Sequence, residues 1–182
     1  MEQRESAFRR RPAWTMLVVS GMLAASALFA TPAAADVGIA GSACNAVDGG
    51  ELVYDDFTKY NDSLSHAVNQ WNALNPINVR ADDAWSYSDV DVSDSNDGGN
   101  GTVAYYSCVA GADDIVMNTH YLDSYSTSRD HAAMTHEFGH AIGLDHGPEV
   151  AVMDPYPADY NPNMNNNLQS WDISTYHSKW GY

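Results

Sequence analysis

The chain has 182 residues, of which 24 are Asp or Glu and only eight are Lys or Arg, so its formal net charge is −16. A protein this acidic repels nucleic acid and anionic membranes and favours the binding of cations. Nucleic acid is therefore excluded as a partner, and so is a membrane once the N-terminal segment described next is removed. Basic substrates would suit the charge, although an acid-rich surface of a secreted protein explains it equally well.

The N-terminal segment has the order of features that is typical of a secretory signal. An arginine triplet precedes an apolar run over residues 16–30, which is short for a membrane span. Small residues follow at Ala33 and Ala35. We predict a signal peptide over residues 1–35, cleaved before Asp36, and a secreted, extracellular protein. An uncleaved membrane anchor is the alternative.

The remaining residues, 36–182, suit one domain with a single core. This part keeps four basic residues against 22 acidic ones, a formal net charge of −18. It has no second apolar run, internal repeat or long linker, so we expect one domain. We also expect a monomer. The two cysteines, Cys44 and Cys108, most simply form one disulfide in an oxidising compartment, with two separate thiols as the alternative.

Hydrophobic periodicity predicts a strand, a helix, several strands and two further helices along the chain. Apolar residues at three- and four-residue steps predict a helix over 58–74, which Asn75-Pro76 ends. Alternation or β-rich composition predicts strands at 52–54, 77–79, 90–92, 102–108 and 115–122, with a loop at 93–101. A polar stretch then leads into a motif-bearing helix, and the last helix is predicted over 168–179. This order indicates an α+β fold with a mixed sheet.

The stretch HEFGHAIGLDH, residues 136–146, has the spacing of a zinc site. His136 and His140 lie one turn apart on one helix face, so both imidazoles can reach one ion. Glu137 can reach a water on the metal without ligating it. Gly143 can adopt the left-handed conformation that ends a helix, and this lets His146 return as the third ligand. Three surface histidines on a solvated helix are the alternative, but the extended motif is much more specific than HExxH alone.

This motif resembles that of the metzincin metallopeptidases, and most closely that of the matrixins. Weaker resemblances lie at 67–72 (AVNQWN), 88–92 (SDVDV) and 171–182 (WDISTYHSKWGY). The resemblance implies a twisted mixed sheet with an active-site helix, a backing helix and a C-terminal helix. It also makes Met153 the methionine of the turn beneath the metal, with an ordinary core methionine as the alternative. Pro155 and Tyr156 match the segment that forms one wall of the specificity pocket.

The function that follows is that of a zinc-dependent endopeptidase acting on proteins or peptides. Glu137 is expected to act on the attacking water as general base and on the leaving amine as general acid. The strand over 102–108 resembles the family's cleft-edge strand, with which an extended substrate could pair. The alternative is a catalytically silent, zinc-bound binding module, an adhesin or inhibitor. Glu137 argues against it, because a silent zinc site does not need that carboxylate.

An Asp-rich stretch over 89–101 is a candidate calcium site. Asp89, Asp91, Asp94 and Asp97 offer the oxygen ligands that Ca²⁺ prefers, and in matrixins the loop at this place helps hold structural ions. The stretch fails the EF-hand pattern, and a plain solvated acidic loop is the alternative. The short interval between the predicted cleavage site and the first strand leads us to expect no propeptide of the matrixin type.

Overall fold

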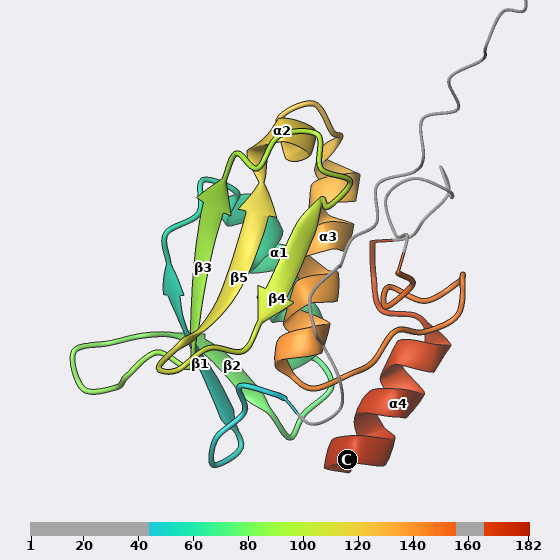
Figure 1. Cartoon of the computed structure of the whole chain (residues 1–182). Coiled ribbons are helices and arrows are strands. Elements are labelled where there is room, and N and C mark those ends of the chain that lie inside the picture. The colour runs from blue at the N-terminus through green and yellow to red at the C-terminus, as the bar shows by residue number, and fades with distance from the viewer. Residues whose placement is uncertain (1–43, 156–165) are drawn as a thin grey trace, which may run out of the picture. The chain divides into compact units, whose positions relative to one another are not determined.

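The computed structural model describes residues 44–155 and 166–182 (Figure 1). The predicted signal segment, 1–35, and Tyr156 lie outside these described residues. The elements in chain order are β1 (Glu51–Asp56), α1 (Asn61–Asn72), β2 (Asn78–Ala81), β3 (Val90–Ser95), β4 (Ala104–Ser107), β5 (Asp113–Asn118), α2 (Thr119–Leu122), α3 (Thr127–Ala141) and α4 (Ser170–Trp180). Within the described ranges, no helix is long and apolar enough to cross a bilayer.

The five strands form one mixed sheet in the order β2-β1-β3-β5-β4. β1 pairs in parallel with β2 and β3, and β3 pairs in parallel with β5, whereas β4 runs antiparallel to β5 at the sheet edge. Helices α1 and α3 cover one face of the sheet (Figure 1). The mixed sheet with its helices confirms the predicted α+β class.

Helix α1 lies behind α3 and supports it. Its buried residues Leu64, Ala67 and Trp71 recur at three- and four-residue steps, so one face of the helix enters the core. The Trp71 indole N–H donates a hydrogen bond of 3.0 Å to the carbonyl of Thr135 in α3. Helix α3 is therefore anchored to α1 by a directional bond as well as by apolar packing.

Two predicted boundaries are wrong. The strand expected over 115–122 ends at Asn118, whose side chain accepts the N–H of His120 and starts the short helix α2. An N-cap side chain that satisfies the first free N–H groups favours a helix over further strand. The loop expected from Ser93 begins later, because β3 continues to Ser95, opposite Asn118 of β5.

A disulfide joins Cys44 to Cys108, whose Cα atoms are 6.5 Å apart. It ties the segment before β1 to the end of β4. The same segment reaches α3, because the N–H of Ala46 donates to the carbonyl of Ala141 at 2.8 Å. The lead-in to the sheet is therefore fixed both to the edge strand and to the end of α3.

The face of the sheet that α1 and α3 leave uncovered carries a row of aspartates. Asp55 of β1 is the register partner of Asp91 of β3, which is in turn the partner of Asp114 of β5. Neighbouring strands lie only about 4.8 Å apart, and like charges directly opposite each other destabilise a sheet. Partial burial, and then the nearby Asp82 and Asp91, raise the pKa of Asp55 above its ordinary value.

We predict that Asp55→Asn raises the melting temperature at pH 7 by about 1–3 °C, because it removes a repelling charge. The raised pKa means that folded Asp55 holds its proton more tightly than unfolded Asp55 does. Its stabilising contribution is therefore present in acid and lost as pH rises through the folded pKa. Thermal unfolding followed by circular dichroism should give a gain at pH 7 that disappears near pH 3. An equal gain from Glu149→Gln, in an exposed loop, would contradict this explanation.

Candidate metal centre

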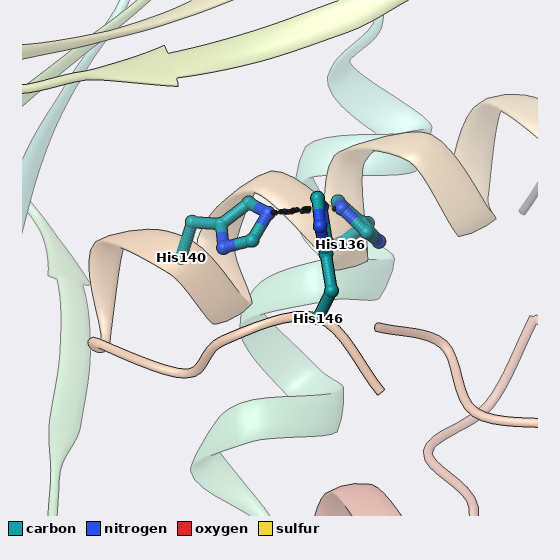
Figure 2. Close-up of side chains that lie close together, drawn as sticks. All are labelled: His136, His140 and His146. Atoms are coloured by element: carbon teal, nitrogen blue, oxygen red, sulfur yellow. Dashed lines mark hydrogen bonds between the residues drawn. The ribbon is translucent and has the colours of Figure 1, made fainter. Parts of the chain in front are cut away.

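Three imidazoles converge at the end of helix α3. His136 and His140 lie in α3 and are buried, whereas His146 comes from the following loop and is exposed. The Nε2 atom of His140 is 3.0 Å from that of His136 and 3.2 Å from that of His146. Figure 2 shows the three rings pointing toward one another. The structure thus brings together the three histidines that the motif singles out.

The hydrogen bonds of the two helical histidines fix which ring nitrogen carries the proton. Nδ1 of His136 lies 2.8 Å from the carbonyl of Val152, and Nδ1 of His140 lies 2.8 Å from the carbonyl of Leu144. A carbonyl can only accept, so both Nδ1 atoms are donors and both Nε2 atoms carry lone pairs. Burial, and then proximity to His140, lower the pKa of His136 well below its usual range, so that the ring is neutral.

This arrangement fits a zinc ion. Two Nε2 lone pairs that face each other at 3.0 Å repel unless a cation lies between them. Three nitrogen ligands arranged tetrahedrally about Zn²⁺ lie about 3.3 Å from one another, close to the separations observed here. Neutral imidazoles oriented by carbonyls through Nδ1 are also the form in which histidine binds metals.

The turn after α3 brings the third imidazole back. Gly143 has a φ of +88°, in the left-handed region that other residues avoid. A Cβ atom there would lie 2.8 Å from Cε of Lys179 and 2.9 Å from Cβ of Asn45, so space as well as conformation requires glycine. The predicted helix end at Gly143 is confirmed, since α3 ends at Ala141.

The floor beneath the histidines is the turn that contains Met153, which is fully buried. A Cβ on Gly139 would collide with the Met153 thioether and lie 3.0 Å from Trp71. The close contact between α3 and this turn therefore requires a residue without a side chain at position 139. Asp172 of α4 holds the same turn from the other side. Its buried carboxylate accepts the N–H groups of Val152 at 3.0 Å and Met153 at 3.2 Å.

Asp172 and Gly139 are the positions that the motif does not reveal. Asp172 also accepts the N–H of Gln169 at 2.7 Å, within the capping box that opens α4. In the sequence, Asp172 stands three positions after a polar residue at a helix start. That pattern predicts a helix cap, but it does not predict a contact with the methionine turn.

The glutamate of the motif, Glu137, is fully buried and follows His136 in α3. Pro155 follows the turn and is partly exposed.

The profile of the matrixin family matches residues 49–181. The chain belongs to the matrixin family. The matrixins are zinc metallopeptidases of the metzincin type, and the match spans every element from β1 to α4. No individual curated protein matches the chain at a significant level.

The four aspartates proposed for calcium are not brought together. Neither group of closely spaced candidate ligands in the described chain contains any of them: one is the histidine triad, and the other is Cys44, Cys108 and Asp113. The four make separate hydrogen bonds, Asp89 with Val53, Asp91 with Ser88, Asp94 with Thr58 and Lys59, and Asp97 with Ser95. The structure of this matrixin therefore gives the calcium hypothesis no support.

We predict that Asp172→Ala lowers the free energy of unfolding by about 2–4 kcal/mol, because buried N–H groups of the methionine turn lose their acceptor. Zinc affinity should fall as well, since the Val152 carbonyl that orients His136 moves with the turn. Urea denaturation and zinc titration measure the two effects. Asp48→Asn, in the exposed turn before β1, is the matched control and should leave both unchanged; a similar loss there would contradict the assigned role.

Proposed function

We propose that this matrixin is a secreted, zinc-dependent endopeptidase, with His136, His140 and His146 as the metal ligands and Glu137 as the proton carrier. The observation that carries the proposal is the convergence of Nε2 lone pairs beside a buried carboxylate. A cation resolves the repulsion among the imidazoles, and a carboxylate next in sequence to a ligand is suited to accept and deliver protons there. The Cys44–Cys108 disulfide is compatible with an extracellular location.

Zinc held by the three imidazoles would supply a Lewis acid that activates water and polarises the scissile carbonyl. Glu137 accepts the proton of the attacking water and then delivers it to the nitrogen of the leaving amine. Glu137 is fully buried, so its carboxylate is shielded from bulk solvent. The Nδ1 hydrogen bonds of His136 and His140 to backbone carbonyls would hold both rings in position during the reaction.

An extended substrate would bind along the sheet edge. Among the strands of residues 44–155 and 166–182, β4 is terminal in the sheet and pairs on one side only, with β5. An unpaired strand edge offers N–H and C=O groups to which a peptide can add as a further strand. In the proposed site, Pro155 and Tyr156 contribute one wall of the pocket that selects the substrate side chain. The binding-module alternative would leave the same ligands but no turnover.

Cleavage of casein tests the proposal. We expect activity that a zinc chelator abolishes and added zinc restores. Glu137→Gln keeps the size of the side chain but removes the base, so it should lower kcat at least about 100-fold while one zinc per chain remains bound. His140→Ala should lose both zinc and activity. Zinc content is measured by atomic absorption on the same samples.

Two outcomes would contradict the peptidase proposal. Cleavage that neither chelation nor Glu137→Gln affects would mean that another site, or a contaminant, is responsible. Full zinc occupancy without cleavage of casein or of a broad peptide library would favour the binding module. Tyr182→Ala, at the exposed C-terminus, serves as the control variant and should retain full activity.

A further inference from the structure

Two large aromatic side chains extend into solvent from the loop over 82–89, which joins β2 to β3. Trp85 and Tyr87 are each 95% exposed. The loop projects from the strands (Figure 1). Exposed aromatic side chains of this size, two residues apart, are not explained by packing within the chain, and such exposed apolar surface is typical of interaction sites.

The backbone that carries these aromatics is held by a network of hydrogen bonds. Asp83 accepts the N–H of Trp85 at 2.8 Å, and the Ser86 hydroxyl donates to Asp82 at 2.7 Å. At the other end of the loop, Asp89 accepts the N–H of Val53 at 2.8 Å. A loop fixed in this way presents its aromatic rings with little backbone freedom left to lose on binding.

The loop joins the aspartate row on the outer sheet face, which consists of Asp55, Asp91 and Asp114. The connection is direct, because the hydroxyl of Ser88 donates to Asp91 at 3.1 Å. Asp82, at the start of the loop, raises the pKa of Asp55 through its charge. The loop that carries the aromatic pair is thus hydrogen-bonded to the aspartate row.

Basic residues do not neutralise this surface. Arg80 reaches the loop, but its guanidinium is 3.0 Å from Glu51 and 3.7 Å from Asp83, so its charge is already matched. Lys59, which follows β1, pairs with Asp123 at 2.5 Å, so its charge is matched as well. The aspartate row therefore keeps its negative charge beside the aromatics.

We propose that Trp85, Tyr87 and the row Asp55–Asp91–Asp114 form a docking surface for an arginine- or lysine-rich segment of another protein. The faces of Trp and Tyr rings attract guanidinium and ammonium groups, and adjacent carboxylates pair with the same cations. A second copy of this chain is a poor occupant, because it would bring the same net charge of −16. This surface lies outside the metal centre, so binding goes beyond the proposed peptidase activity and does not need it.

Fluorescence anisotropy with a labelled peptide of alternating Arg and Gly tests the proposal, with a Glu-Gly peptide as the negative probe. The protein carries Glu137→Gln so that the probe is not cut. We expect binding of the Arg peptide that weakens with added salt and persists after zinc removal. Trp85→Ala/Tyr87→Ala should weaken it about tenfold, and so should Asp55→Asn/Asp91→Asn.

Matched control variants distinguish specific binding at the proposed surface from non-specific electrostatic attraction to an acidic protein. Tyr182→Ala removes an equally exposed tyrosine, and Asp62→Asn/Glu149→Gln removes two charges away from the row; each should change affinity less than about twofold. Equal weakening by these controls would overturn the proposal. Tyr87-dependent binding of a neutral oligosaccharide, or Trp85-dependent dimerisation in ultracentrifugation, without binding of the Arg peptide would also overturn it. Because the test measures binding to a surface outside the metal centre, in a protein that carries Glu137→Gln, its failure leaves the peptidase proposal untouched.

Discussion

The metal centre depends on one buried carboxylate, that of Asp172, which lies outside the histidine motif. It binds the N–H groups of Val152 and Met153, and the Val152 carbonyl in turn accepts the Nδ1 proton of His136. A carboxylate with several charge-assisted hydrogen bonds is a rigid anchor in a buried place. The position of one imidazole is therefore set by α4, an element that begins 29 residues after α3 ends.

Close approach of backbone to side chain is the second requirement of the site. Gly139 lets the Met153 thioether lie directly against α3, and Gly143 lets the chain turn beneath Asn45 and Lys179. The same turn places the Leu144 carbonyl against Nδ1 of His140. Two glycines thus serve the two helical histidines in different ways: one admits the floor beneath them, and the other brings a hydrogen-bond acceptor and the third imidazole into position.

One short stretch of sequence was sufficient to predict that the three histidines converge, because the features that bring them together lie within residues 136–146. The helical repeat of four residues and a glycine with positive φ place His136, His140 and His146 without knowledge of the rest of the fold. Asp172 could not be found in this way, because its role appears only when α4 packs against the methionine turn. The end of β5 was missed for a related reason: the run from Ile115 has strand composition, but the Asn118 side chain caps a helix there and overrides it.

The two faces of the sheet meet different physical demands. The face toward α1 and α3 is apolar and fixes the helix that carries the histidines, so its residues are explained by stability. On the other face, the row Asp55–Asp91–Asp114 puts like charges opposite one another, which opposes folding. Neutral polar residues would suit a solvated strand equally well without that repulsion. A cation between neighbouring carboxylates of the row would replace their repulsion with attraction, because each carboxylate then faces an opposite charge. The arrangement that is unfavourable in the isolated chain is therefore favourable in a complex with a basic partner.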